Sequence, residues 1–278
     1  MTRILLFLLT AGVLAAQPPA KIVSGKRYPR LVIRNAIIIE GNGTPAAGPK
    51  DIVVENGMIT AIVPLDLVAA GRGEGRRPSK GDGEIDAAGK YVMPGLINAH
   101  GHVQDERGGI PQPVEYELKI WLSCGITTVR DVGSDTAKTL QLRKQSAEGE
   151  IACPRLFVYP MLNRGANPAN AEQARARIRD FKAMGADGVK LLGVYRDVME
   201  GAEDEAHKLG LRVAHHVGVE ETNAWDDINF GTTSIEHWYG IPDAALGNGQ
   251  PRRCSCSPPA VCGGRRIPKN CSKCWTPW

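Results

Sequence analysis

Two histidines one residue apart, His100 and His102, have the side chains and spacing of metal ligands. They close the stretch Met93–His102, whose apolar middle predicts the end of a buried strand. Alternate residues of a strand point to the same side, so both imidazoles share a face, and Gly101 leaves room for close approach. Neutral imidazoles suit Zn²⁺ and similar ions. The pair alone is equally compatible with two hydrogen-bonded histidines at a strand end.

Three more side chains capable of metal or proton chemistry, Lys190, His216 and His237, lie at or near the carboxyl ends of other predicted strands. Lys190 sits inside an apolar run, where burial lowers the pKa of an ammonium group and makes the neutral amine accessible. A neutral amine can take up CO₂ to form a carbamate, an anionic bridge between two metal ions. The competing interpretation is a lysine that extends to the rim of the fold.

His215 and His216 are adjacent, so they point to opposite sides of their strand and only one can face the site. We favour His216 because it lies nearer the carboxyl end of the strand, and His215 stays open as the alternative.

Before its last segment, the chain has two regions with different sequence patterns. Residues 17–92 contain short β-branched runs, including a tight hairpin predicted at Asn56-Gly57, and indicate a small N-terminal β-sandwich. Residues 93–246 alternate six predicted strands with helices, as repeated βα units require. A parallel barrel and a doubly wound sheet both fit this pattern. The barrel is favoured because the unusual polar residues fall at strand carboxyl ends, where barrel enzymes keep their sites.

The pattern resembles the amidohydrolase superfamily, in particular its imidazolonepropionase-like and Xaa-Pro dipeptidase-like branch. The matching segments occur in the family's order and are Met93–His102, Gly125–Asp131, Ala186–Lys190, Val213–His216 and Gly231–His237.

This resemblance implies an α/β fold, an incomplete (β/α)₈ TIM-type barrel, and a metal-dependent hydrolase of a carbon–nitrogen bond in an amide, cyclic amide or dipeptide. It implies two divalent ions, expected to be Zn²⁺, which generate the attacking hydroxide from bound water. The implied ligands are His100 and His102 on one ion, His216 and His237 on the other, and carboxylated Lys190 between them. Lys190 and His237 are assigned as catalytic.

The first residues predict export. Residues 1–16 combine a basic start with an apolar run shorter than the roughly 20 residues of a spanning helix, which is typical of a cleaved signal peptide. We therefore expect a periplasmic or secreted protein without a membrane anchor after cleavage; an uncleaved anchor is the alternative. Six of the 34 basic residues and no acidic residue lie in the last 30 positions. The main body is thus near neutral, which gives no indication of nucleic-acid binding.

The last segment, residues 247–278, has a different composition, with five of the seven cysteines and many Arg and Pro residues. It predicts a disordered or frameshifted tail on a barrel truncated after its sixth strand. A cysteine-rich module that binds zinc or forms disulfides is the alternative. The function therefore has a second interpretation, an inactive amidohydrolase remnant or binding protein. The expected partner is a small-molecule or peptide-like substrate. The sequence leaves open which substrate this is and what oligomeric state the protein adopts.

Overall fold

A computed structural model of the chain describes residues 27–74, 76–163, 168–217 and 222–246. It divides into two compact units, the first reaching Pro94 and including residues 145–152, the second formed by residues 95–144 and those from Cys153 onward. The predicted signal peptide and the cysteine-rich tail lie outside the described residues. No helix of the described residues is both long and apolar enough to cross a membrane.

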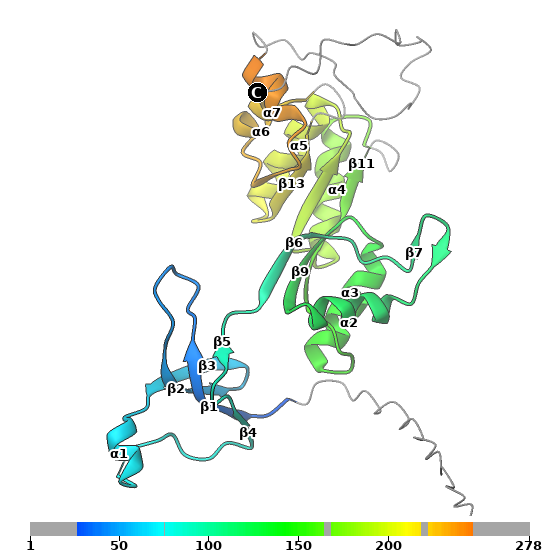
Figure 1. The fold of residues 1–278 in the computed structure, drawn as a ribbon. Helices are drawn as coiled ribbons and strands as arrows, with labels where there is room; N and C mark the ends of the chain where they lie inside the picture. Colours follow the sequence, from blue (N-terminus) through cyan, green and yellow to red (C-terminus); the bar gives the residue numbers. More distant parts are fainter. Residues whose placement is uncertain (1–26, 75, 164–167, 218–221, 247–278) are drawn as a thin grey trace, which may run out of the picture. The chain divides into compact units, whose positions relative to one another are not determined.

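The first unit is built on one mixed sheet with the strand order β3-β2-β1-β4 (Figure 1). Its elements are β1 (Arg30–Ile38), β2 (Ala47–Glu55), β3 (Met58–Pro64), α1 (Leu67–Gly71), β4 (Gly83–Asp86) and β5 (Tyr91–Val92). β2 and β3 pair antiparallel across Asn56 and Gly57, whose φ values of 49° and 79° suit a tight hairpin turn. The predicted hairpin is therefore confirmed. The described part of this unit forms a single sheet, so the predicted sandwich stays a prediction.

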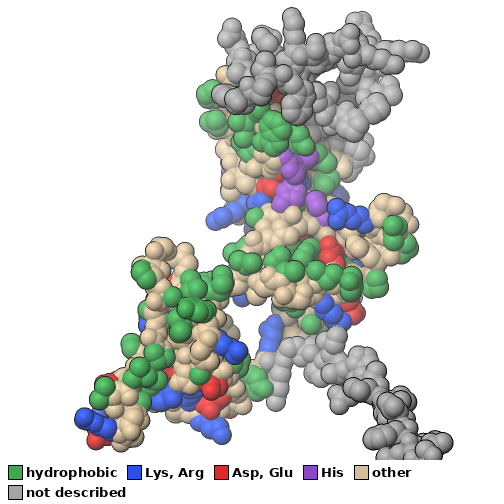
Figure 2. Space-filling model, viewed as in Figure 1, with side chains coloured by type: hydrophobic (Ala, Val, Ile, Leu, Met, Phe, Trp, Pro, Cys, Tyr) green, Lys and Arg blue, Asp and Glu red, His purple; other side chains and the backbone are tan. Residues whose placement is uncertain are grey.

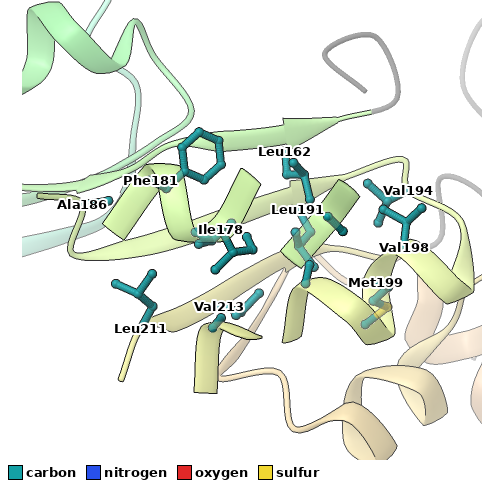
Figure 3. Packing of buried hydrophobic residues seen from close by; sticks show 14 residues of the cluster. Leu162, Ile178, Phe181, Ala186, Leu191, Val194, Val198, Met199, Leu211 and Val213 are labelled. Carbon is teal, nitrogen blue, oxygen red and sulfur yellow. The ribbon is translucent and has the colours of Figure 1, made fainter. Parts of the chain in front are cut away.

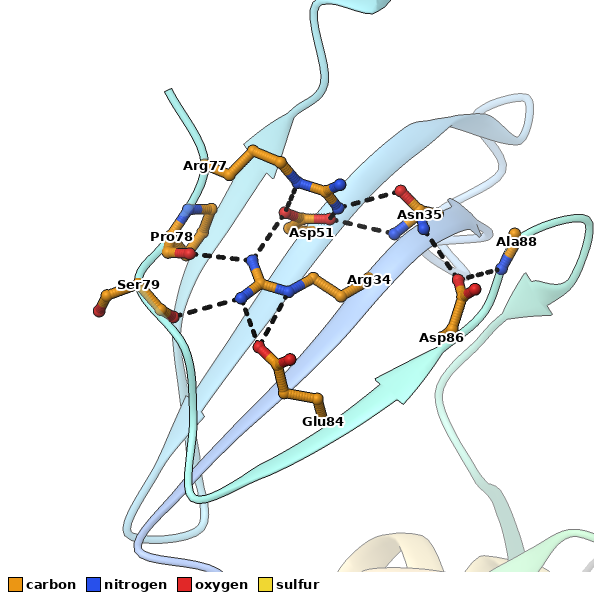
Figure 4. Close-up of polar contacts among 9 residues, drawn as sticks. All are labelled: Arg34, Asn35, Asp51, Arg77, Pro78, Ser79, Glu84, Asp86 and Ala88. Atoms are coloured by element: carbon orange, nitrogen blue, oxygen red, sulfur yellow. Dashed lines mark hydrogen bonds and ion pairs between the residues drawn. The ribbon is translucent and has the colours of Figure 1, made fainter. Parts of the chain in front are cut away.

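The buried carboxylate of Asp51 in the first unit is paired with two arginines. The Asp51 carboxylate is buried and lies between Arg34 and Arg77, with distances of 3.1 Å to Arg34 Nη1 and 2.6 Å to Arg77 Nη2 (Figure 4). The backbone amide of Asn35 donates a third hydrogen bond to the same carboxylate. This network joins β1, β2 and the loop before β4.

The second unit has parallel strands with helices between them, as predicted for its α/β class (Figure 1). Its elements before residue 165 are β6 (Leu96–Gly101), β7 (Glu106–Arg107), β8 (Ile110–Pro111), α2 (Val114–Ser123), β9 (Ile126–Val132), α3 (Thr136–Glu148), β10 (Arg155–Tyr159) and β11 (Met161–Asn163). Those after it are α4 (Ala171–Ala183), β12 (Gly188–Leu192), α5 (Arg196–Lys208), β13 (Arg212–His216), α6 (Ala224–Phe230), β14 (Ser234–Glu236) and α7 (Gly240–Leu246).

The parallel strands form two sheets that follow the chain in sequence order, β6-β9-β10 and β11-β12-β13-β14. The break falls at Pro160, which lacks the N–H that a continuous strand would use for pairing. The Pro160 carbonyl instead accepts a hydrogen bond of 2.9 Å from the Lys190 amide. This sequential parallel order is the one that the predicted barrel strands require, although barrel closure stays a prediction.

The core of the second unit lies between β12 and β13 and the helices α4 and α5 (Figure 3). Ile178 and Phe181 of α4 pack with Met199 of α5 against Val189 and Leu191 of β12. Helix α4 begins where the Asn170 side chain accepts a hydrogen bond from the Gln173 amide, a capping role that asparagine favours. Since Val189 and Leu191 face the helices, the residue between them, Lys190, must face the opposite side of the sheet.

Candidate functional site

Four histidine rings contact one another in the second unit, where Figure 2 shows them gathered on one face. His100 ends β6, and its ring centroid lies 5.2 Å from that of His102 and 4.7 Å from that of His237. His237 follows β14, and its ring lies 4.4 Å from that of His216, the last residue of β13. Side chains from three strand ends therefore meet at one place.

Strand alternation explains which residues of β12 and β13 face this cluster. Val213 packs in the helix-facing core, so Ala214 and His216 face the other side, which Lys190 also faces. In the register of β12 and β13, Lys190 lies opposite Ala214, and Leu192, two residues further along, lies opposite His216. Lys190 and His216 thus share a face although they come from different strands.

His215 lies on the other side of β13. Its ring is 1% exposed, and Nδ1 lies 2.7 Å from Asp227 Oδ1 of α6, which is also buried. The pair joins β13 to α6 and leaves His216 as the residue of the two that contacts His237.

His237 has an unusual backbone. Its φ of 63° is in the left-handed region, which residues other than glycine rarely adopt. This conformation costs free energy of order 1–3 kcal/mol and occurs where surrounding structure or function requires it. Here it directs the chain out of β14 while the ring contacts His100 and His216.

Lys190 is the largest fully buried side chain of the described residues, and its Nζ has no hydrogen-bond partner there. Burial lowers the pKa of Lys190 to about 8, with the positive charge of Arg130 adding to the effect and the negative charge of Glu236 opposing it. Part of the amine is therefore neutral near physiological pH, which is the form that reacts with CO₂.

Three histidines of the cluster, His102, His216 and His237, have lowered pKa values that favour the neutral ring. Burial, then the charge of His237 and Lys190, lowers the pKa of His216 to about 4. Burial is likewise the largest cause that lowers the pKa of His102 and of His237. At pH 7 these rings are unprotonated and can offer a nitrogen lone pair.

This donor set fits divalent metal ions such as Zn²⁺, which bind neutral imidazole and anionic oxygen. As the side chains stand, no group of three or more His, Cys, Asp or Glu residues among the described residues could hold an ion. A carbamate on Lys190 would add an oxygen donor beyond those residue types. The chemistry of the donors fits an ion, although the side-chain positions of the described residues do not form a ligand cage.

Glu236 and Arg130 complete the site and were not predicted. Glu236 is buried next to His237, and one carboxylate oxygen is hydrogen-bonded to His100 Nδ1 while the other accepts from Arg130. Burial raises the pKa of Glu236, but hydrogen bonds from His100 and Ser234 outweigh it, so the pKa lies below its usual value. Both residues stand beside predicted site elements, in Gly125–Asp131 and Gly231–His237, and that adjacency was the only local signal.

The amidohydrolase family model matches residues 91–245, which contain every predicted site residue. The chain belongs to the amidohydrolase family. Among curated relatives of this amidohydrolase, dihydroorotase from Trichlorobacter lovleyi is 28% identical over 204 residues, covering 70% of this chain and 44% of the relative. Enamidase from Eubacterium barkeri is 30% identical over 210 residues, covering 68% and 50%. The chain thus spans about half the length of these curated relatives.

Solved structures support the amidohydrolase fold. A Xaa-Pro dipeptidase with bound methionine superposes with a TM-score of 0.60 at 20% identity, covering 75% of this chain and 61% of that one. Phenylurea hydrolase B gives a TM-score of 0.59 at 18% identity, covering 75% and 59%. At these identities the likeness concerns the fold. The resemblance stated from the sequence motifs is thereby confirmed at the level of the family.

Proposed function

We propose that this amidohydrolase is a metal-dependent hydrolase of a carbon–nitrogen bond in an amide, cyclic amide or dipeptide. The observation that carries the proposal is the buried Lys190 amine, which has no partner in the described part of the chain and lies on the sheet face that also bears His216. An unpaired buried amine costs stability, so its presence beside neutral imidazoles favours a chemical role. Dihydroorotase and enamidase among the relatives are consistent with carbon–nitrogen substrates.

The strands that carry these residues are proposed to be the first six of an incomplete (β/α)₈ barrel. His100 and His102 would hold one divalent ion, expected to be Zn²⁺, and His216 and His237 a second. Lys190 would lie between them as a carbamate: its neutral nitrogen bonds to the carbon of CO₂ and releases one proton to solvent. When bound, such ions polarise the scissile carbonyl and supply a hydrolytic nucleophile at neutral pH.

The chain's own residues would prepare the site for this chemistry. Burial keeps His102, His216 and His237 unprotonated, so no proton competes with an ion for their lone pairs. Tyr239 stacks on the His216 ring, with centroids 5.7 Å apart, and limits the rotation of that ligand. Export through residues 1–16 remains part of the proposal.

Metal analysis together with a hydrolysis panel tests this function. After incubation with Zn²⁺ and bicarbonate, we expect two ions per chain and turnover of at least one cyclic amide, acyl amide or Xaa-Pro dipeptide. His100→Ala should lower the metal content and abolish turnover. His207→Ala is the matched control, because the His207 ring is bonded to the Gly231 carbonyl and is absent from the ring contacts of the described histidines. A wild-type chain with neither metal nor turnover would favour the binding-protein alternative.

A further inference from the structure

Glu236 joins two strand ends that are far apart in the sequence. It ends β14 and is 5% exposed, and its Oε2 is hydrogen-bonded to Nδ1 of His100 at the end of β6, 136 residues away. The contact occupies one of the two ring nitrogens of His100. The other nitrogen, Nε2, is then the one available to a ligand.

Arg130 of β9 holds both partners of this contact. Its Nη2 donates to Glu236 Oε1, and its Nε donates to the carbonyl of Ala99, directly before His100, at 2.6 Å. Ser234 extends the network: its hydroxyl donates to Glu236 Oε1 at 2.8 Å and accepts from Arg130 Nη1 at 2.9 Å. The carboxylate is thus fixed by one strand while it contacts the histidine of another.

A carboxylate in this position determines the tautomer of an imidazole. Because an ionised carboxylate only accepts hydrogen bonds, His100 must donate from Nδ1, and in the neutral ring Nε2 then carries the lone pair. In metal sites such contacts orient the ligand ring and raise its basicity. The same geometry is also compatible with a purely structural ion pair that ties β6, β9 and β14 together.

We propose that Glu236, held by Arg130, is a positioning residue that fixes the ring and the Nδ1–H tautomer of His100. The proposal rests on the proposed function for its metal-binding consequence. Its tautomer consequence is independent of any ion. The two consequences therefore require separate measurements on the full chain.

The first measurement is NMR of the ¹⁵N-labelled, metal-free chain. In the wild type, the His100 ring should show a protonated Nδ1 and an unprotonated Nε2. In Glu236→Gln, where the amide must satisfy Arg130 and His100 together, we expect the His100 nitrogens to shift toward a mixture of tautomers. A purely structural ion pair would lower stability and leave these nitrogen shifts in place.

The second measurement is the affinity for Zn²⁺ alone, by competition with a chromophoric chelator. Glu236→Gln should bind Zn²⁺ about 10- to 100-fold more weakly than the wild type, as for other residues that orient a ligand histidine. Arg130→Lys keeps one positive charge near Glu236 and should give a smaller loss. Glu203→Gln is the matched control: Glu203 is also buried, but its side chain contacts Thr232 and His207.

The outcomes separate the two proposals. Unchanged His100 nitrogen shifts and unchanged Zn²⁺ affinity in Glu236→Gln would overturn the positioning role. A wild-type chain that binds no Zn²⁺ but shows the tautomer change would overturn the metal-dependent function and retain the positioning of His100. If Glu236→Gln fails to fold, Arg130→Lys decides the same question through the nitrogen shifts.

Discussion

The two units treat a buried charge in opposite ways. In the first unit, Asp51 is 1% exposed and is bonded to Arg34, Arg77 and the Asn35 amide. Burial raises the pKa of Asp51, but the arginines and the amide outweigh it, and the pKa lies below its usual value. In the second unit, Lys190 is equally buried, its Nζ has no partner among the described residues, and its pKa falls to about 8.

This difference distinguishes a charge that supports the fold from one that the fold tolerates. A paired buried carboxylate loses several favourable contacts when it is removed, so it resists substitution for reasons of stability. An unpaired buried amine lowers stability as long as it is present, because its desolvation is not compensated. A folded chain that carries such a destabilising group is therefore a candidate for a chemical use of that group.

The largest expected effect is on hydrolysis by Lys190→Met. Loss of the bridging group should lower turnover at least about 1,000-fold, since polarisation by metal ions contributes several kcal/mol to the transition state. The same substitution should raise the free energy of unfolding of the metal-free chain, by about 1–3 kcal/mol, because it removes an unsatisfied donor. Turnover assays and denaturant unfolding measure the two effects. Exposed Lys182→Met is the control, and a less stable Lys190→Met chain would contradict the comparison.

The next effect is the loss of stability in Asp51→Asn. We expect the free energy of unfolding of the first unit to fall by about 2–4 kcal/mol. This is below the upper range for a broken buried pair because the Arg77 side chain is 35% exposed. Hydrogen exchange of the β2 amides should accelerate, whereas Zn²⁺ affinity should not change. Slower or unaltered exchange in β2 would show that Asp51 does not carry this network.

A smaller effect, of at most about 3 kcal/mol, is the pH dependence that Lys190 imposes on the metal-free chain without CO₂. The pKa of Lys190 falls from 10.5 to about 8 on folding. Between these values the unfolded chain binds more protons, so stability should rise as pH rises from 8 toward 10.5. Denaturant unfolding across this range should show the rise in the wild type relative to Lys190→Met. Parallel curves for the two chains would indicate an ordinary lysine.

The smallest effect tests a paired charge with more solvent contact. Asp187 lies before β12, where it accepts from Arg143 at 2.7 Å and from the Val158 amide at 2.8 Å, and its side chain is 30% exposed. Asp187→Asn should cost about 1 kcal/mol, since solvent screens such pairs and the amide side chain can still accept one bond. Thermal unfolding of the Asp187→Asn and Asp51→Asn variants compares their losses of stability. A larger loss for Asp187→Asn would break the relation between burial and cost.

Local sequence preferences predicted parts of the fold. The hairpin at Asn56-Gly57 and the helix after Asn170 follow from turn and capping preferences that act over a few residues. No residue range was predicted for helix α6, although its capping box at Asn223 is also a local signal. Helix α2 also had no predicted range, since it follows Pro113 without a side-chain cap and buries only Leu118.

The sequence by itself determined which side chains are available for metal or proton chemistry, since the residue types of His100, His102, Lys190, His216 and His237 and their places in strand-like runs are local features. Only the tertiary structure decided that His215 turns to Asp227 while His216 meets His237. Strand alternation separates the two rings but does not say which side packs against helices. The tertiary structure also decided the contact between His100 and Glu236. A contact across 136 residues depends on how the strands assemble and leaves no short-range pattern in the sequence.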